Sequence, residues 1–475
     1  MLHSDLKSYR IQTLAVPAHT EMTNIFAHFA DKPWAMLLDS ANSQHPNAQF
    51  DIMVASPIST LAAYGVKCTT TTNIQVQPTT QTYDANPLDV LRSLLNDVLD
   101  TSDNGKIKQN QPSENPKVPF IAGALGYFGY DLGRCFETFV EQAKTPYQSP
   151  DMAIGVYTWS IVHDKHQDQF YLCSLNQFDS PEPNDIIQLL ANDNTAADFS
   201  LTSKWQSNLS KHDYIQRLAK IDDYLKAGDC YQVNLAQRFE ADYRGSPWQA
   251  YLALRDANQA PFSAYIHLEN ATIMSISPER FLSVNAQTVK TQPIKGTRPR
   301  SLDKIEDQKQ IDALKVSQKD RAENLMIVDL LRNDLSKTCE DNTIDVPALF
   351  EIESFEAVHH LVSTVTGKLN PGEDAMSLLQ GAFPGGSITG APKIRAMQII
   401  DELEPDKRHI YCGSIGYINH FGDMDTSICI RTLLCENDNI YCWAGGGIVL
   451  DSVDQDEYQE SFDKVSKILP VLERL

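Results

Sequence analysis

The chain has 475 residues, of which 62 are acidic and 40 are basic, and its net charge is −22. A negative field of this size repels nucleic-acid phosphates and anionic membrane surfaces, so neither is expected as a partner. An anionic substrate is compatible with this charge only in a pocket where lysine, arginine or backbone NH groups reverse the local sign.

Nine cysteines are scattered along the chain without a C-x-x-C pair, which argues against a disulfide framework and against a thiolate zinc site. The first thirty residues lack the apolar run of a signal peptide, and no stretch approaches the roughly 18 apolar residues that would span a bilayer. We therefore expect a protein of a reducing compartment, the cytoplasm.

The N-terminal third predicts short strands in a mostly antiparallel sheet. Two polar tracts, at residues 101–118 and 176–198, interrupt the apolar pattern and are expected to be surface loops or linkers. The expected strands cover residues 34–38, 50–55 and 120–125, and a hairpin is expected over residues 157–173 with its turn at residues 163–166.

A helix is expected after Ser210, because Ser210 and Asp213 form a weak capping box and apolar residues recur at helical spacing until Gly228. The next segment, residues 230–239, alternates between an apolar face and a polar face and predicts a strand. Further strands are expected at residues 272–284, 410–418, 426–434 and 440–443, and helices at residues 317–336, 392–403 and 454–468.

Two glycine-rich segments could bring the backbone close to a ligand. Residues 383–393 are expected to open into a helix with Pro392 in its first turn, where free NH groups suit a carboxylate or phosphate. Gly445, Gly446 and Gly447 follow an expected strand and would allow a similar approach. A tight helix entry without ligand is the more common explanation of the first segment, and a bulge or tight bend explains the second about as well as a ligand does.

Two pairs of acidic residues are expected on helix faces, Asp320 with Glu323 and Glu457 with Glu460. Each pair alone is typical of a solvated helix surface. If the two pairs converge in the fold, they would offer the all-oxygen environment that Mg²⁺ prefers.

Lys295 lies between Ile294 and Gly296, just after a strand-like run. A partly desolvated lysine has a lowered pKa and a nucleophilic amine, whereas the common alternative is a side chain that extends to solvent. Glu279 could act as an acid if burial raises its pKa, or could be a surface residue beside Arg280.

His359 and His360 would point in opposite directions in an extended segment. A packed or surface role is the more common one for such a histidine. The sequence contains no G-x-S-x-G nucleophile elbow, no H-E-x-x-H motif and no G-x-G-x-x-G segment after a strand, so it gives no sign of an α/β-hydrolase, a zinc protease or a dinucleotide-binding protein.

Eight segments together resemble the chorismate-utilising enzymes, a family that includes anthranilate, isochorismate and salicylate synthases. The resemblance covers roughly residues 205–475. Lys295 in PIKGT is similar to the members that aminate chorismate at C4, since anthranilate synthases generally carry alanine there, and WAMLLDS and FDIMVASP extend this similarity toward the N-terminus. The eight segments are SPERF, PIKGTRPR, DRAENLMIVDLLRNDL, VHHLVSTVTG, FPGGSITGAPK, RHIYCGSIGYI, DTSICIRTL and AGGGIVLDS.

The resemblance implies an α+β fold with large antiparallel sheets packed as a sandwich and flanked by helices. Residues 1–200 would form an N-terminal region with strands in the same body, and residues 205–475 would form the chorismate-binding catalytic domain. Lys295 would attack C2 of chorismate, and Glu279 would protonate the departing 4-hydroxyl group. Ammonia would then attack the covalent intermediate at C4. The aminated product would supply 4-aminobenzoate and folate synthesis.

The resemblance also implies Mg²⁺ as cofactor, held by Glu323 and Glu460 with support from Asp320 and Glu457. Arg431 and Tyr411 would bind the enolpyruvyl carboxylate, while Lys464 and the glycine NH groups would hold the other end of the substrate. The residues implied in substrate binding are His360, Ser387, Tyr411, Arg431, Gly445, Gly446, Gly447 and Lys464.

Ammonia would come from a separate glutamine amidotransferase subunit, because no cysteine here lies in a glycine-flanked elbow. Ser40 and Pro261 match positions of a tryptophan-binding pocket in relatives, so bound tryptophan is a further expectation. Two alternatives remain open: formation of anthranilate or isochorismate, and a catalytically idle tryptophan-binding regulatory partner.

Overall fold

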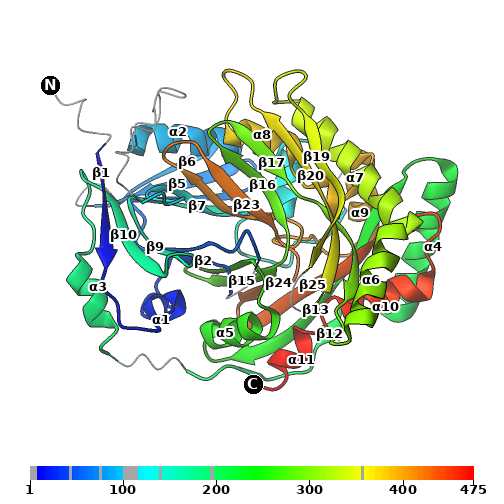
Figure 1. Ribbon diagram of the computed structural model, residues 1–475, viewed down its shortest axis with the longest axis horizontal. Helices are drawn as coiled ribbons and strands as arrows, with labels where there is room; N and C mark the ends of the chain where they lie inside the picture. The colour runs from blue at the N-terminus through cyan, green and yellow to red at the C-terminus, as the bar shows by residue number, and fades with distance from the viewer. Residues whose placement is uncertain are drawn as a thin grey trace.

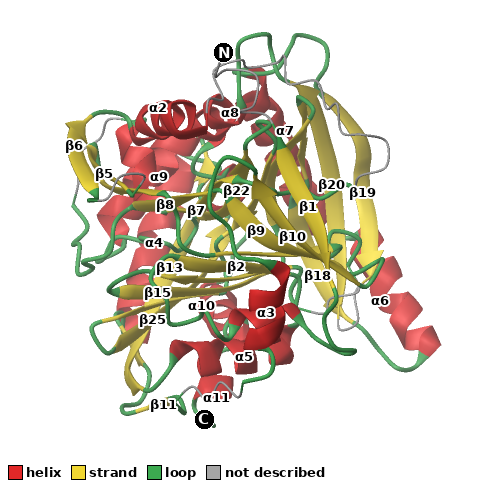
Figure 2. Ribbon diagram, turned by 90° about the vertical axis from the view of Figure 1, so that its left-hand side faces the viewer, coloured by secondary structure: helices red, strands yellow, loops and turns green. Residues whose placement is uncertain are grey.

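The computed structural model describes residues 8–41, 45–73, 77–99, 116–137, 142–192, 197–354 and 358–475. Two large β-sheets form the centre of the molecule and helices surround them, as Figures 1 and 2 show. The expected α+β fold with large antiparallel sheets is confirmed. Most of the polar tract at residues 101–118 lies outside the described residues.

The first sheet has 13 described strands, and its strand pairs are antiparallel. The predicted hairpin is present in it as β9 and β10, with its turn at residues 165–168 rather than at residues 163–166. The strand order is β1 (Tyr9–Leu14), β10 (Gln169–Leu175), β9 (Trp159–Asp164), β3 (Phe50–Val54), β2 (Ala35–Asp39), β14 (Phe262–His267), β15 (Ala271–Ser277), β24 (Thr432–Glu436), β25 (Asn439–Ile448), β13 (Gln232–Arg244) and β11 (Ser200–Leu201), with β12 (Gln206–Ser207) and β21 (Gly390–Ala391) also paired to β13.

The second sheet has 12 described strands, again in antiparallel pairs. The strand order is β18 (Ile294–Pro299), β20 (Val358–Lys368), β17 (Thr288–Thr291), β16 (Arg280–Asn285), β23 (Met424–Ile428), β22 (Ser414–Asn419), β7 (Gly123–Phe128), β8 (Met152–Tyr157), β4 (Ser59–Tyr64), β5 (Lys67–Thr72) and β6 (Thr79–Asp84), with β19 (Asp345–Ser354) paired to β20.

Apolar side chains on both faces of the central strands explain the layered packing. In β15, Ile273 belongs to a buried cluster that contains residues of both sheets, whereas Met274 and Ile276 belong to a second cluster on the opposite face, together with residues of α1 and α5. Successive residues of a strand point to opposite faces, so β15 must be covered on both sides.

The helices cover the outer faces and ends of the sheets (Figure 1). Among the contacts that fix them, α5 packs on β15, α9 on β13, α10 on β25, and α7 on β18 and β20. The helices are α1 (Met22–Phe26), α2 (Pro87–Leu99), α3 (Pro183–Leu189), α4 (Lys211–Ala227), α5 (Pro247–Asn258), α6 (Lys304–Val316), α7 (Gln318–Ser336), α8 (Ala375–Ala382), α9 (Lys393–Leu403), α10 (Asp454–Asp463) and α11 (Leu469–Leu472), with 3₁₀ turns η1 (Tyr130–Cys135) and η2 (Gly386–Ile388).

The predicted ends of α4 are confirmed. The Ser210 hydroxyl accepts a hydrogen bond from the Asp213 NH at 3.1 Å, and Gly228 ends the helix in a left-handed conformation with φ 78°. Several details differ from expectation: α10 ends at Asp463 rather than at residue 468, and β22 begins at Ser414 rather than at residue 410. Helix α3 lies within the tract predicted as a loop, and Pro392 caps α9 from outside its first turn.

Two segments predicted as single strands are each divided between the two sheets. Residues 272–284 form nearly all of β15, then a link through Pro278 and Glu279, then β16 in the other sheet. Residues 426–434 likewise divide into β23 and β24, with Arg431 in the link. Proline cannot donate to a ladder hydrogen bond, which explains the first break, and Arg431 adopts a positive φ of 53° at the second.

Strands from both halves of the chain contribute to both sheets. In the first sheet, β2 of the N-terminal region pairs with β14, and in the second sheet β7 pairs with β22. Because both regions share both sheets, the expected division of the chain into residues 1–200 and 205–475 stays a prediction. In the part of the chain that the structure describes, no helix is both long enough and apolar enough to cross a membrane.

Candidate active site

A cavity of about 670 Å³ lies beside the two links that connect the sheets. It is lined by both links, by β18, β20 and β25, and by the facing helices α7 and α10. Of the residues expected in the active site, the lining contains Glu279, Lys295, Asp320, Glu323, His360, Ser387, Tyr411, Arg431, Gly445, Gly447, Glu457, Glu460 and Lys464.

Backbone hydrogen bonds fix the two links against each other. The Ile428 NH donates to the Glu279 carbonyl at 3.0 Å, and the Ile276 NH donates to the Arg431 carbonyl at 3.0 Å. Each link is thus bonded to the strand that leads into the other. Glu279 and Arg431 consequently project from a rigid part of the fold.

Ser387 connects Lys295 with Glu279. The Lys295 Nζ donates to the Ser387 carbonyl at 3.4 Å, and the Ser387 hydroxyl donates to Oε1 of Glu279 at 3.4 Å. Both hydrogen bonds are long, which leaves the amine and the carboxyl group available to other partners. The Lys295 amine on β18 and the Glu279 carboxyl group on the link before β16 therefore face the same cavity.

Burial changes the acid strength of both groups. It raises the pKa of Glu279 to about 7, against the opposing charge of Lys295. Burial also lowers the pKa of Lys295, and here the Glu279 carboxylate opposes the shift. Both shifts favour the forms that the chemistry needs, a protonated carboxyl group as the acid and a neutral amine as the nucleophile.

Arg431 is a partly buried cation that forms no ion pair with the described residues. Burial lowers the pKa of its guanidinium group, and no carboxylate of the described residues offsets this effect. An unpaired buried charge is costly unless a ligand neutralises it. Arg431 therefore marks the part of the cavity where an anionic group of a ligand is expected to bind.

The four acidic residues reach the cavity from two helices. Asp320 and Glu323 lie on α7, and Glu457 and Glu460 lie on α10. Burial raises the pKa of Glu323 and of Glu457. Burial works in the same direction on Glu460, but the Lys464 ammonium at 2.7 Å lowers the pKa of that carboxyl group.

Three of these carboxylates have protein partners. Asp320 forms an ion pair with Arg298 at 3.0 Å, Glu457 accepts from the Ser452 hydroxyl at 2.6 Å, and Glu460 pairs with Lys464. As the side chains lie, no three His, Cys, Asp or Glu residues among those described are close enough together to hold a metal ion. The donors are nevertheless oxygen atoms, the kind that Mg²⁺ prefers.

The three glycines of β25 have different surroundings. A β-carbon at Gly446 would lie 3.1 Å from Oε1 of Glu460 and 3.2 Å from Oε2 of Glu457, so the backbone here lies close to both acidic side chains. A β-carbon at Gly447 would lie 2.6 Å from the Gln232 amide nitrogen, and one at Gly445 would lie 2.0 Å from the Leu235 carbonyl oxygen. None of the three positions has room for a side chain unless a neighbour moves.

The two histidines point in opposite directions, as expected for a strand. His359 is fully buried and bonds to Asp307 at 2.9 Å, away from the cavity. His360 lines the cavity, and its Nδ1 lies 2.8 Å from the Thr297 hydroxyl. Burial lowers the pKa of His360 to about 4, with Arg431 adding to the shift, so the ring is neutral near pH 7.

Other residues of the cavity were not expected from the sequence. Asn234 and Trp443 line it from β13 and β25, and Thr297 and Arg298 line it from β18. Asn234 lies on the predicted polar face of its strand, and a buried polar face is the signal that could have identified it. Trp443 gave no comparable signal because an aromatic residue in a strand is usually part of the core.

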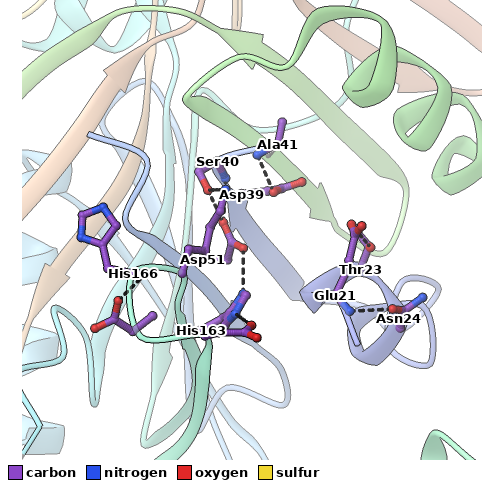
Figure 3. A network of polar contacts seen from close by, with 12 residues as sticks. Glu21, Thr23, Asn24, Asp39, Ser40, Ala41, Asp51, His163 and His166 are labelled. Carbon is purple, nitrogen blue, oxygen red and sulfur yellow. Dashed lines mark hydrogen bonds and ion pairs between the residues drawn. The ribbon is translucent and has the colours of Figure 1, made fainter. Parts of the chain in front are cut away.

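A second cavity of about 320 Å³ contains one of the two residues expected to bind tryptophan. Pro261 lines it, together with Asp39 and Arg280. Ser40, the other expected residue, is buried next to Asp39, and its NH and hydroxyl donate to Oδ1 of Asp51 at 2.9 and 2.5 Å (Figure 3). Its hydroxyl also accepts from the Lys165 ammonium at 2.9 Å.

Comparison with known proteins defines the class to which this fold and cavity belong. Residues 37–470 match the family described as chorismate binding enzyme. The chain belongs to this family.

The chain is similar over most of its length to curated relatives and to a solved structure. It is 50% identical over 449 residues to aminodeoxychorismate synthase component 1 of Escherichia coli, covering 94% of this chain and 95% of the relative. It is 34% identical over 398 residues to anthranilate synthase component 1 of Lactococcus lactis, covering 82% and 85% of the two chains. The crystal structure of anthranilate synthase component I from Streptococcus pneumoniae superposes with a TM-score of 0.74 at 30% identity, covering 90% of this chain and 93% of the other.

Proposed function

We propose that the protein converts chorismate and ammonia to 4-amino-4-deoxychorismate, as the chorismate-aminating component of aminodeoxychorismate synthase in 4-aminobenzoate and folate biosynthesis. The observation that carries this proposal is the meeting of Lys295 and Glu279 at Ser387 inside a cavity with an unpaired arginine. The similarity to aminodeoxychorismate synthase component 1 supports the same reaction.

The reaction proceeds in two displacements on the substrate ring. The Lys295 amine forms a bond to C2, the ring double bond shifts, and the C4–oxygen bond breaks as Glu279 gives its proton to the hydroxyl group, which leaves as water. Ammonia then forms a bond to C4 and the bond from C2 to Lys295 breaks. The Glu279 carboxylate takes the proton released by the new amine, so both residues return to their starting forms.

The two ends of the dianionic substrate bind to opposite walls of the cavity. Arg431 and Tyr411 hold the enolpyruvyl carboxylate, which neutralises the guanidinium group buried there. Lys464 and the NH groups around Gly446 and Gly447 bind the other end. His360 and Ser387 complete the binding surface between the two ends.

Mg²⁺ would be held by Glu323 and Glu460, with Asp320 and Glu457 in support. When bound, the ion neutralises the ring carboxylate of the substrate. Carboxylate oxygens are the kind of ligand that Mg²⁺ prefers. The ion would compete for these carboxylates with Arg298 and Lys464, which pair with two of them.

Ammonia reaches this chain from a separate glutamine amidotransferase subunit. A glutaminase needs a reactive thiolate, and no cysteine of this chain lies in a glycine-flanked elbow. Tryptophan would occupy the second cavity next to Pro261 and near Ser40. The acidic chain works in the cytoplasm without nucleic-acid or membrane partners.

The test is an assay of the purified chain with chorismate, Mg²⁺ and an ammonium salt, with products identified by mass spectrometry. A lyase that releases 4-aminobenzoate is added in a parallel reaction. We expect 4-amino-4-deoxychorismate with ammonium and no product with glutamine until an amidotransferase subunit is added. Lys295→Ala should abolish the covalent route and shift any remaining product toward anthranilate, which fluorescence detects. Anthranilate or isochorismate as the product of the unmodified chain would refute the proposal.

A further inference from the structure

A fully buried ion pair lies directly behind the wall of the candidate active site. The Arg408 side chain is 1% exposed and the Glu404 side chain 5%, and two hydrogen bonds of 2.8 and 2.6 Å join them in a bidentate arrangement. Neither residue lines the cavity. Replacing such a pair by apolar residues is often neutral for stability, so stability alone does not explain why a pair is present.

The remaining donors of Arg408 bind two separate segments of the cavity wall. Its Nη1 donates to the Ile388 carbonyl at 3.0 Å, and its Nη2 donates to the Asn234 carbonyl at 3.0 Å. Ile388 belongs to η2 and Asn234 belongs to β13, and both residues line the cavity. The guanidinium group thus sets the separation between these two segments.

Tyr411 and Glu404 extend the same connection. The Arg408 guanidinium carbon lies 5.6 Å from the centre of the Tyr411 ring, and the Tyr411 NH donates to the Arg408 carbonyl at 3.0 Å. Glu404 accepts from the Ala236 NH on β13 at 2.9 Å. Three parts of the wall, from β13, η2 and the segment before β22, therefore meet at one ion pair.

The position of η2 matters for the chemistry because Ser387 lies in it. Ser387 accepts from Lys295 through its carbonyl oxygen and donates to Glu279 through its hydroxyl group. The next residue, Ile388, is held by Arg408. A displacement of η2 would therefore alter the hydrogen bonds through which Ser387 joins the amine to the carboxyl group.

We propose that Arg408, oriented by Glu404, is a positioning residue that fixes η2, β13 and Tyr411 relative to one another and so aligns Lys295 and Glu279 on the substrate. This inference rests on the proposed function, because it assigns these two groups to the reaction. Arginine suits the role because its planar group donates in several fixed directions, whereas the ammonium group of lysine is a compact point charge on a flexible stem.

The test compares Arg408→Lys with Arg255→Lys as a matched control. Arg255 is also buried, with 5% of its side chain exposed, and pairs with the buried Asp39 at 2.6 Å, but it does not line the active-site cavity. For each variant, kcat and KM for chorismate are measured at saturating ammonium and Mg²⁺, and thermal unfolding gives the folded fraction.

We expect Arg408→Lys to lower kcat about 10- to 100-fold, since small misplacements of reacting groups have effects of this size. KM should change less than about threefold, because Arg431 and Lys464 still bind the substrate. Arg255→Lys should lower the unfolding temperature while kcat per folded molecule stays within about twofold of the unmodified chain.

If Arg408→Lys does not fold, a double variant, Arg408→Met with Glu404→Leu, takes its place in the comparison. The double variant leaves no unpaired buried charge. We expect the same loss of kcat in this variant. A kcat per folded molecule within about twofold of the unmodified chain, in either variant, would overturn the inference, and so would a rise in KM alone. The product made by the unmodified chain tests the proposed function separately, since the ratios between variants do not depend on which product forms.

Discussion

Asp320, one of the four proposed magnesium ligands, forms an ion pair with Arg298 at 3.0 Å. Arg298 is about one third exposed, so solvent weakens the pair, and such pairs contribute about 0.2 to 1 kcal/mol. A metal ion that binds Asp320 must displace this partner. The arginine is therefore expected to act as a weak competitor of Mg²⁺.

Arg298→Gln should lower the Mg²⁺ concentration that gives half-maximal activity about two- to fivefold, because it removes this competitor. Titration of turnover with Mg²⁺ measures the effect, and isothermal calorimetry with Mg²⁺ alone provides a readout that does not depend on activity. A higher Mg²⁺ requirement in the variant would show that Arg298 helps to assemble the site.

Glu279→Gln should lower kcat about 10²- to 10⁴-fold, the usual contribution of a general acid. Glutamine keeps the size of the side chain and the hydrogen bond from Ser387 but has no proton to give. Ser387→Ala is the matched control, because it removes the hydrogen bond to Glu279 and leaves the acid in place. Comparable turnover in the Gln variant would contradict the role of Glu279.

The pH dependence of kcat/KM should fall on its alkaline side as Glu279 ionises. The acid acts in its protonated form, and burial raises its pKa to about 7. Protonated Glu279 therefore predominates below about pH 7, and the rate should decrease about tenfold per pH unit well above it. Measurements from pH 5.5 to 9 test this expectation. The alkaline limb should be absent from the residual activity of Glu279→Gln, and its persistence there would assign it to another group.

The sequence pattern identified most elements but not the places where the chain changes sheets. Residues 272–284 read as one strand because their apolar character continues through the link, and periodicity carries no information about which sheet a strand joins. Pro278 was the local signal of the break. The links matter for function because they position Glu279 and Arg431 in the cavity.

The composition of the cavity was predictable only in part. Sequence motifs pointed to the residues on η2, α7 and α10, which lie close together although they are distant in the chain. Arg408 is the opposite case. An exposed basic residue is the usual expectation for an arginine, and only tertiary packing places this one among the largest fully buried side chains.

Gly446→Ala and Gly445→Ala should have different effects although the residues are adjacent. A methyl group at Gly446 would contact the side-chain ends of Glu460 and Glu457 at 3.1 and 3.2 Å, which can shift but would then no longer lie correctly for Mg²⁺. We expect about tenfold weaker Mg²⁺ binding with little loss of stability.

A methyl group at Gly445 would lie 2.0 Å from the Leu235 carbonyl oxygen, which belongs to the backbone of the neighbouring strand. We expect destabilisation of about 3 kcal/mol in this variant. Thermal unfolding and Mg²⁺ titration of both variants separate the two effects. A loss of stability in Gly446→Ala equal to that in Gly445→Ala would mean that the carboxylates cannot move.

Arg431→Gln should stabilise the free protein and weaken substrate binding. The guanidinium group is partly buried, burial lowers its pKa, and no carboxylate of the described residues offsets the cost of this charge. Glutamine removes this charge while keeping a polar side chain. We expect the free energy of unfolding to rise by about 1 kcal/mol, as is common when a functional site gives up a strained or unpaired group.

The same substitution should raise KM for chorismate by at least about tenfold, because a charged hydrogen bond to the substrate carboxylate is lost. Lys464→Gln is the comparison, since Lys464 already pairs with Glu460 at 2.7 Å in the free protein. Its removal should raise KM without raising the unfolding temperature. A lower unfolding temperature for Arg431→Gln would show that the guanidinium group stabilises the fold, and the assignment of Arg431 as an unpaired receptor for an anion would then be wrong.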